Sequence, residues 1–124
     1  MNLFTSQSFT SHSGLHLDWK IECDALSESD LSTLAKIIVN NYKFGEVIGI
    51  PRGGLRLADK LEPYRIKDHD VILIVDDVLT TGKSMNNARK EIEKQYSDKH
   101  CEGLVIFARG KCPGWITPIF QLCI

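Results

Sequence analysis

The sequence predicts a single α/β domain, residues 1–124, in which helices flank a central, mostly parallel sheet, with a small N-terminal strand or hairpin beside it. Apolar runs within 71–75 and 102–108 are typical of strands buried on both faces of a parallel sheet. The segments 31–42 and 82–95 each place apolar residues on one helical face. Strands that alternate with helices in this way favour a parallel sheet covered by helices.

The remaining elements follow from local patterns. Residues 1–8 are polar and predict a loosely held start, whereas 15–22 alternates apolar and polar residues, which predicts a strand with one covered face. A turn at Ser13 and Gly14 can make this strand part of a hairpin. Helix-capping residues at 27–30 open the first helix, which Gly45 is expected to end. The other expected elements are a strand at 46–50, a short helix at 55–61 stopped by Pro63, and an edge strand at 115–122 because Pro118 cannot donate to a ladder.

Composition excludes several classes of protein. The chain has 124 residues, is 43% hydrophobic and carries a net charge of −1, so nothing indicates a surface for a nucleic-acid polymer or a membrane. Its N-terminus has no charged segment followed by an apolar one, which favours a cytoplasmic protein. The four cysteines show no Cys-x-x-Cys spacing, so reduced cysteines are favoured over a zinc site that only the fold could assemble.

Two acids and a hydroxyl-rich turn follow the apolar run at 71–75. Asp76 and Asp77 come where the run stops, so we expect them at the carboxyl end of the strand, where open α/β sheets bind ligands. The turn after them supplies hydroxyl groups and a flexible backbone: Thr80, Thr81, Gly82 and Ser84. Amide groups and the positive end of the following helix favour a phosphate. Carboxylates for hydroxyl groups beside a phosphate cradle indicate a sugar phosphate.

Three other interpretations of this stretch are weaker. A nucleoside-triphosphate P-loop needs a glycine five positions before Gly82, where Asp77 stands. A receiver domain needs most of its length after its acidic cluster, and the chain that follows is too short for this. A plain buried strand whose acid or threonine only caps the next helix does not require two acids, three hydroxyl groups and a glycine.

A second loop with affinity for phosphate follows the strand expected at 46–50. Paired glycines, Gly53 and Gly54, allow the backbone to approach a ligand closely, and Arg52 can fork onto phosphate oxygens. A plain turn with a surface arginine is the alternative. The loop leaves its strand in the same way as the loop after Asp77, so both are expected at the same edge of the sheet.

The stretch from Val71 to Met85 resembles the phosphoribosyl-pyrophosphate (PRPP) motif of type I phosphoribosyltransferases, with Lys83 where glycine is common. The loop at 51–54 is similar to the pyrophosphate loop of the same family. The resemblance implies a minimal version of that fold, with the N-terminal segment as a hood. It also implies that Asp76 and Asp77 contact the ribose hydroxyls and hold Mg²⁺, directly or through water. The 5′-phosphate would be held by Thr80, Thr81, Gly82, Lys83 and Ser84, and pyrophosphate by Arg52, Gly53 and Gly54.

Two weaker similarities point to the orotate enzymes of this family. Their hood begins with a pattern similar to Phe9 to Gly14, although Leu15 stands where they carry a basic residue, which argues against orotate itself. Their long mobile loop contains a piece similar to the stretch from Lys67 to His69, so both of these residues are candidates for catalysis. The connector at 62–70 is short, however, and a solvated connector is the alternative.

The resemblance implies transfer of a 5-phosphoribosyl group from PRPP to a nitrogenous base, an orotate-like pyrimidine or a purine, by an enzyme that forms a homodimer. Trp115 can stack a base, although a core or interface tryptophan fits its position equally well. No protein nucleophile is expected. The alternative function is a non-catalytic module that binds PRPP or a nucleotide as a signal, which the short connector favours because water would compete in an open site.

Overall fold

The computed structural model describes the backbone of residues 3–10 and 16–122, and the side chains of residues 3–4 and 21–122. In chain order the elements are β1 (Phe4–Thr10), β2 (His16–Ile21), the 3-10 helix η1 (Cys23–Ala25), α1 (Glu28–Asn41), β3 (Glu46–Gly49), α2 (Leu55–Leu61), the 3-10 helix η2 (Glu62–Tyr64), β4 (Val71–Leu79), α3 (Lys83–Gln95), β5 (His100–Arg109) and β6 (Ile116–Leu122). None of the helices in these ranges is long and apolar enough to cross a membrane.

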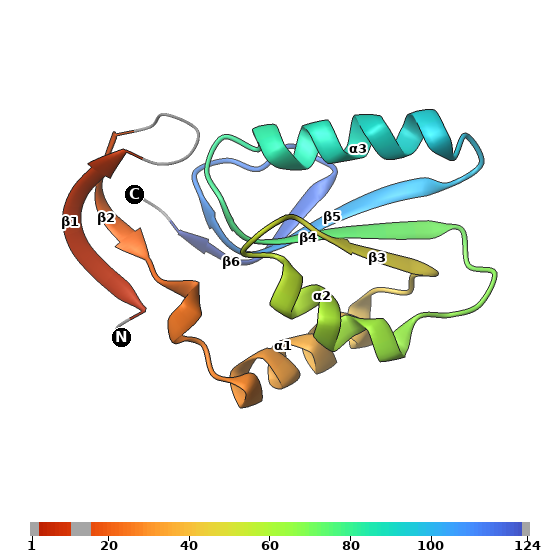
Figure 1. Ribbon diagram of the computed structural model, residues 1–124, viewed down its shortest axis with the longest axis horizontal. Coiled ribbons are helices and arrows are strands. Elements are labelled where there is room, and N and C mark those ends of the chain that lie inside the picture. The colour runs from red at the N-terminus through yellow and green to blue at the C-terminus, as the bar shows by residue number, and fades with distance from the viewer. Residues whose placement is uncertain (1–2, 11–15, 123–124) are drawn as a thin grey trace.

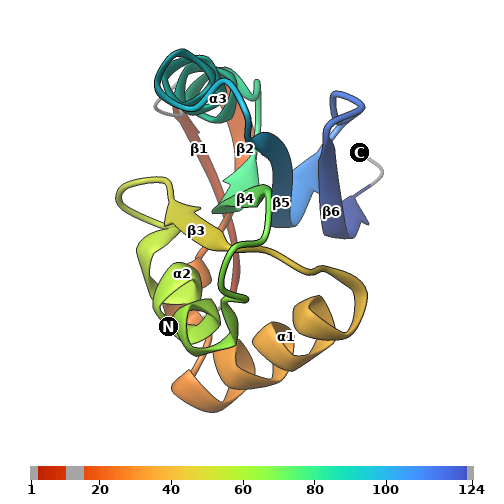
Figure 2. The same ribbon diagram turned by 90° about the vertical axis from the view of Figure 1, so that its right-hand side faces the viewer.

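Four strands form a parallel sheet in the order β3-β4-β5-β6, which confirms the predicted architecture. Helix α3 covers one face of the sheet, and α1 and α2 cover the other (Figures 1 and 2). The last strand, β6, lies at an edge of the sheet, as predicted from Pro118, which has no amide hydrogen to donate to a second neighbouring strand. Pro118 lies opposite Val105 of β5. All four strands run the same way, so their carboxyl ends meet at one edge.

The core is divided by the sheet into two apolar clusters. Leu73 and Val75 of β4 pack with α1 and α2, whereas Ile72 and Ile74 pack against α3. These four side chains are at most 2% exposed, which accounts for the unbroken apolar run: a strand covered on both faces has no polar side. The hydrophobic stabilisation of the fold is therefore concentrated at β4 and β5, directly behind the residues of the candidate site.

Helix α1 begins with a reciprocal capping box. The backbone amide of Asp30 donates to Ser27 Oγ at 3.0 Å, and the Ser27 amide donates to Asp30 Oδ2 at 2.8 Å. Two of the amides that a helix leaves unpaired are thereby satisfied. The start of the helix was predicted from these residues, but α1 ends at Asn41, with Tyr42 as its C-cap, before the expected stop at Gly45.

The N-terminal segment is an ordered hairpin in which β1 and β2 pair antiparallel, from Phe4 opposite Ile21 to Thr10 opposite His16. The prediction of a loosely held start over residues 1–8 was therefore wrong for residues 4–8, which belong to β1, because cross-strand pairing rather than apolar content makes β1 a strand. The expected turn at Ser13 and Gly14 lies outside the described residues. The Phe4 ring meets the edge of Phe107 with centroids 6.1 Å apart, which ties the hairpin to the main sheet.

Candidate functional site

The residues of the candidate site meet at the carboxyl edge of the sheet. The loop after β3, the end of β4 and the start of α3 all lie there, and the hairpin β1–β2 stands at the same side of the molecule (Figure 1). The β3–β4 ladder places Gly49 opposite Val75, so the loop at 50–54 emerges beside Asp76 and Asp77. The two loops predicted to bind phosphate are thus neighbours in space.

Gly53 and Asp77 are in direct contact. A Cβ atom built on Gly53 would lie 2.1 Å from Asp77 Oδ2 and 2.4 Å from Asp77 Cγ, so no side chain fits without displacing that carboxyl group. Gly53 is therefore required here for close approach of the backbone to a neighbouring side chain. The contact joins the predicted pyrophosphate loop to the predicted ribose-binding acids.

The two carboxyl groups differ from ordinary surface acids. Burial, and then the negative charge of Asp77, raises the pKa of Asp76 to about 8. The carboxylates also accept local bonds, from the Asp77 amide to Asp76 Oδ1 at 2.8 Å and from the Val78 amide to Asp77 Oδ1 at 2.7 Å. Two half-buried acids that repel each other favour ligands that bring a cation or hydroxyl donors.

The acids lie within β4, because the strand continues to Leu79 instead of stopping at Val75 as predicted. Pairing of Val78 with Phe107 and of Leu79 with Ala108 extends the strand past the polar residues. In a regular strand, residues three positions apart point to opposite faces of the sheet. Val75 and Val78 nevertheless both pack on the side of α1 and α2, so the alternation of side chains is interrupted at the two acids. Backbone pairing to β5 thus holds the acids more firmly than a free turn would.

The loop at 80–84 leads into a helix that no side chain caps. Gly82 is the N-cap of α3 and has φ of 82°, a left-handed conformation that glycine tolerates best. The Lys83 amide donates to Thr81 Oγ1 over a long distance of 3.4 Å. Unlike Ser27 of α1, the N-cap of α3 has no side chain that accepts from the first amides, and the helix dipole favours an anion at this end. Lys83 and Ser84 are exposed beside these amides.

In the loop after β3, Arg52 and Gly53 are exposed, whereas Gly54 is buried. The Gly54 amide donates to the Ile50 carbonyl at 2.8 Å, and the Ile50 amide donates to the Val75 carbonyl at 2.9 Å. The amide of Gly54 is therefore used inside the protein, contrary to its predicted role as a donor to pyrophosphate. Arg52 and Gly53 present the groups of this loop that face outward. The Pro51–Arg52 peptide bond is cis.

A cavity of about 310 Å³ opens beside Asp77 on the side of α1 and α2. Arg52, Gly53 and Asp77 line one side, and Cys23 and Asp24 of η1 line another. Burial, and then the charge of Asp77, raises the pKa of the Cys23 thiol. Sequence reasoning missed this role of η1, because no motif marks the stretch and only the tertiary fold brings it to Asp77.

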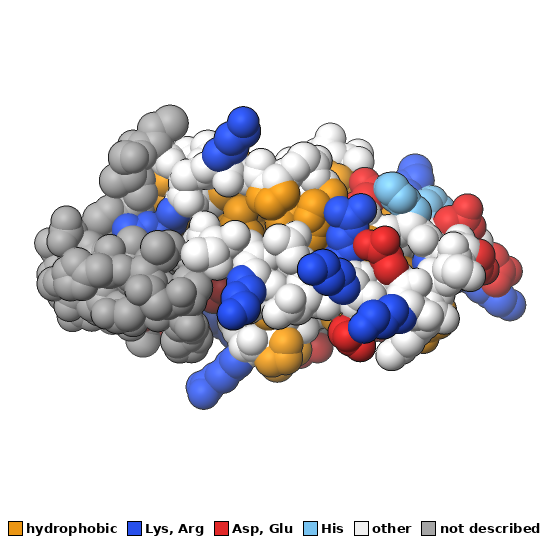
Figure 3. Space-filling view, turned by 90° about the horizontal axis from the view of Figure 1, so that it is seen from above, with side chains coloured by type: hydrophobic (Ala, Val, Ile, Leu, Met, Phe, Trp, Pro, Cys, Tyr) orange, Lys and Arg blue, Asp and Glu red, His pale blue; other side chains and the backbone are white. Residues whose placement is uncertain are grey.

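Lys67 and His69 are not brought to these acids. Both precede β4, at the amino edge of the sheet, where the Ile66 amide donates to the Phe44 carbonyl at 2.8 Å and Arg65 Nε donates to the Gly45 carbonyl at 2.7 Å. At about 3.3 Å per residue, β4 puts roughly 20 Å between its first residue and Asp77. The side chains that Figure 3 colours as histidine lie toward the right-hand end of that view. Lys67 and His69 therefore lie in the connector before β4, at the opposite edge of the sheet from the acids of the same chain.

Trp115 packs against α3. Its Nε1 donates to Asn86 Oδ1 at 3.0 Å, and the guanidinium carbon of Arg89 lies 4.9 Å from the ring centroid. The ring also crowds Gly103, where an added Cβ would lie 2.8 Å from it. These contacts pack the Trp115 ring against α3 and β5 and give it partners within the protein, so the structure favours the core interpretation over a base-stacking one.

The donor set at the carboxyl edge fits Mg²⁺. Within the described side chains, no three His, Cys, Asp or Glu residues lie together as a metal-binding cluster. Asp76 and Asp77 supply two carboxylates, and magnesium commonly takes one or two protein carboxylates together with the phosphates of its substrate. Burial and the charge of Asp77 disfavour the charged form of Asp76 and so raise its pKa, and a cation bound between the two carboxylates would favour that form.

Comparison with known proteins shows the fold. No family model and no curated protein matches the chain. Among solved structures, orotate phosphoribosyltransferase from Aeropyrum pernix is similar with a TM-score of 0.76 and 20% identity over 96% of this chain and 88% of that one. Leishmania donovani UMP synthase is similar with a TM-score of 0.73 and 20% identity, over 97% of this chain but only 34% of its own length. A hypothetical protein from Neisseria gonorrhoeae with bound ppGpp is similar with a TM-score of 0.55 and 19% identity, over 95% of this chain and 82% of that one. The chain has the type I phosphoribosyltransferase fold.

Proposed function

We propose that this protein transfers a 5-phosphoribosyl group from PRPP to a nitrogenous base and releases pyrophosphate. The observation that carries the proposal is the contact between Gly53 and Asp77, because it joins two loops that suit the two ends of this substrate. An orotate-like pyrimidine or a purine is the acceptor. The fold of the similar solved enzymes supports the class of reaction, and the residues at the edge supply the chemistry.

The residues act by holding PRPP rather than by attacking it. Asp76 and Asp77 accept hydrogen bonds from the ribose hydroxyls, and their negative charge lies near a ribose that becomes cationic as its bond to pyrophosphate breaks. The amides at the start of α3, with Thr80, Thr81 and Ser84, hold the 5′-phosphate and so fix the position of the sugar. Arg52 and the exposed Gly53 face the departing pyrophosphate.

Mg²⁺ would be held by Asp76 and Asp77 together with the oxygens of PRPP, and it would neutralise charge on the pyrophosphate. Removal of the cation by a chelator is expected to weaken PRPP binding as well as turnover, since the two acids then repel the substrate. Isothermal titration of PRPP with and without EDTA measures this, and equal affinity would remove magnesium from the proposal.

A panel of bases tests the reaction. The protein is incubated with PRPP, Mg²⁺ and, separately, orotate, uracil, adenine, guanine and hypoxanthine, and released pyrophosphate and new nucleotide are measured together. Formation of both with one base supports the proposal. Pyrophosphate without a nucleotide indicates hydrolysis by water, and neither product with any base contradicts an enzymatic role.

A regulatory module that binds PRPP or a nucleotide without turnover is the second candidate. The observation that favours it is the connector at 65–70, which is bound to the amino edge of the sheet and supplies no lid to the described part of the site. The similar Neisseria gonorrhoeae structure holds ppGpp, which also supports a nucleotide ligand. Binding of PRPP or ppGpp without turnover in the panel would decide for this candidate.

A further inference from the structure

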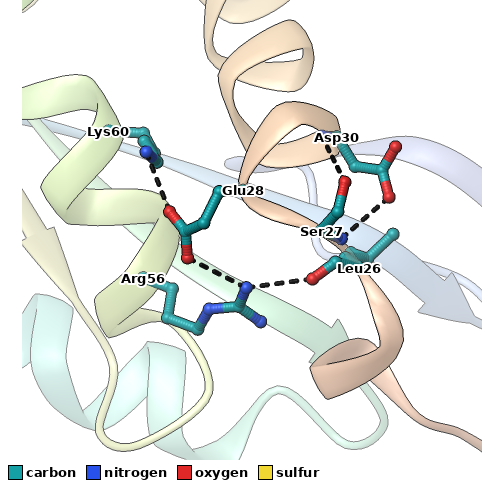
Figure 4. Close-up of polar contacts among 6 residues, drawn as sticks. All are labelled: Leu26, Ser27, Glu28, Asp30, Arg56 and Lys60. Atoms are coloured by element: carbon teal, nitrogen blue, oxygen red, sulfur yellow. Dashed lines mark hydrogen bonds and ion pairs between the residues drawn. The ribbon is translucent and has the colours of Figure 1, made fainter. Parts of the chain in front are cut away.

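Arg56 connects the helix behind the pyrophosphate loop to the turn that leaves the hairpin. It lies in the first turn of α2, and its Nη2 donates to the Leu26 carbonyl at 2.9 Å and to Glu28 Oε1 at 3.2 Å (Figure 4). Glu28 Oε2 also accepts from Lys60 Nζ at 2.8 Å. One carboxylate of α1 therefore has two cationic partners on α2, and only one of these also holds the backbone.

The bonds of Arg56 differ in strength. The ion pair with Glu28 is exposed, with 39% and 68% of the two side chains accessible, so solvent screens it and it contributes little to stability. The bond to the Leu26 carbonyl is part-buried and joins residues thirty positions apart. Water competes less with the bond to the Leu26 carbonyl than with the exposed ion pair, and this bond restrains the backbone directly. Lys60 makes only the exposed kind of contact.

The chain that Arg56 holds is one wall of the cavity beside Asp77. Leu26 ends η1 and its amide donates to the Cys23 carbonyl at 3.0 Å, so a bond to Leu26 restrains the whole turn. Cys23 and Leu26 line the cavity together with Gly53 and Asp77, and Arg56 lines it too. The guanidinium thus spans two walls that belong to different parts of the chain.

We propose that Arg56 is a positioning residue, which holds the η1 wall against Asp77 and the pyrophosphate loop and thereby sets the affinity for PRPP. The inference deepens the proposed function and rests on it for the ligand. The planar guanidinium reaches a carbonyl and a carboxylate at once, which the point charge of lysine does not reproduce. Lys60→Met is the matched control, because it removes a cation from Glu28 and leaves the Leu26 bond.

Labelling of Cys23 tests, without any ligand, whether Arg56 holds the η1 wall in place. A maleimide is applied to the ligand-free protein, and modification of the peptides with Cys23 and Cys112 is followed by mass spectrometry. Arg56→Met is expected to speed labelling of Cys23 about fivefold, because local opening of the wall exposes the thiol. Cys112, in the loop after β5, should keep its rate in every variant, and Lys60→Met should label as the unchanged protein does. Unaltered labelling of Cys23 in Arg56→Met would overturn the proposal.

PRPP affinity tests the consequence. Arg56→Met is expected to raise the dissociation constant about tenfold, the effect of one lost hydrogen bond, with Arg56→Lys in between and Lys60→Met within about twofold of the unchanged protein. Weaker binding with unaltered Cys23 labelling would mean that Arg56 touches the ligand itself, which contradicts a positioning role. If the unchanged protein binds no PRPP, the proposed function fails, while the labelling still decides whether Arg56 holds the wall.

Discussion

At the residue scale, the geometry of the site requires glycine at position 53, because any side chain there would collide with the Asp77 carboxyl group. The α-carbon hydrogens of this residue lie against the Asp77 carboxyl group, so the loop and the acid occupy one shared space. Parallel strands predicted that the two would be neighbours, since both follow strands whose carboxyl ends meet. That they touch could not be predicted, because the distance depends on the course of the loop after Ile50.

Gly53→Ala is expected to weaken PRPP binding at least about tenfold, or about 1.4 kcal/mol, because the new methyl group must push the Asp77 carboxyl away from the ribose. Titration calorimetry measures the loss. Gly114→Ala is the matched control, since a Cβ there would meet nothing within 4 Å. Equal affinities of the two variants would show that Asp77 can move without consequence.

Asp76→Asn and Asp77→Asn are each expected to abolish detectable PRPP binding while the protein stays folded. The ligand-free Asp76→Asn variant should also melt higher at neutral pH, by about 4 °C or more, because folding must either bury the charge of this carboxyl beside another acid or protonate it, and asparagine carries neither cost. Differential scanning calorimetry in EDTA measures the change. A lower melting temperature would mean that the local bonds to the amides outweigh the repulsion.

At the scale of elements, the two long helices start in opposite ways. Helix α1 satisfies its own amides through Ser27 and Asp30, whereas α3 starts at a left-handed glycine without a side-chain cap. Capping is a property of stable scaffolds, and its absence at α3 leaves donors for a ligand. The start of α1 was predicted from the capping residues at 27–30, because capping is local chemistry, whereas α3 was predicted from its apolar face and begins at Lys83, one residue after the predicted start at Gly82.

Ser27→Ala is expected to lower the free energy of unfolding by about 1 kcal/mol through loss of the cap. Urea denaturation measures it. The bonds to Ser27 also hold the pKa of Asp30 below its usual range, so the stabilisation by this carboxylate is present at neutral pH and is lost as the pH falls through the lowered pKa. The difference between the unchanged protein and Asp30→Asn should therefore vanish in acid, and a difference independent of pH would contradict the capping box.

Elements defined by tertiary contacts were predicted less well. Polar β1 is a strand only because β2 pairs with it, and β4 outlasts its apolar run because β5 continues beside it. The bond from Arg56 to the Leu26 carbonyl joins residues thirty positions apart, and no local sequence pattern predicts such a contact. The type and order of the helices and strands of the main sheet, by contrast, followed from periodicity.

At the scale of the whole molecule, the sheet has a ligand edge and an amino edge with different tasks. The connector at 65–70 is held at the amino edge by Arg65, which pairs with Glu46 and Glu62. Similarity of a short stretch to a mobile loop suggested Lys67 and His69 for catalysis, but a stretch of three residues does not determine at which end of a strand it lies. Topology and length decide that, and here they separate these residues from the acids.

Lys67→Ala and His69→Ala are therefore expected to keep PRPP affinity within about twofold of the unchanged protein, since charges roughly 20 Å away across a folded domain are largely screened. Asp77→Asn serves as the positive control in the same titration. A loss of tenfold or more in either variant would indicate that the amino edge of a second copy reaches the site.

The register of the β3–β4 ladder sets the spacing between the two loops of the candidate site. Its register, Gly49 opposite Val75, sets how far Arg52 stands from the threonine turn, and a slip of two residues would change that spacing by about 7 Å. No rotation of side chains would compensate for such a step. For the proposed substrate PRPP, this backbone register would set the distance between the groups that hold pyrophosphate and those that hold the 5′-phosphate, so proteins of this fold with altered loops but the same register should select ligands of the same length.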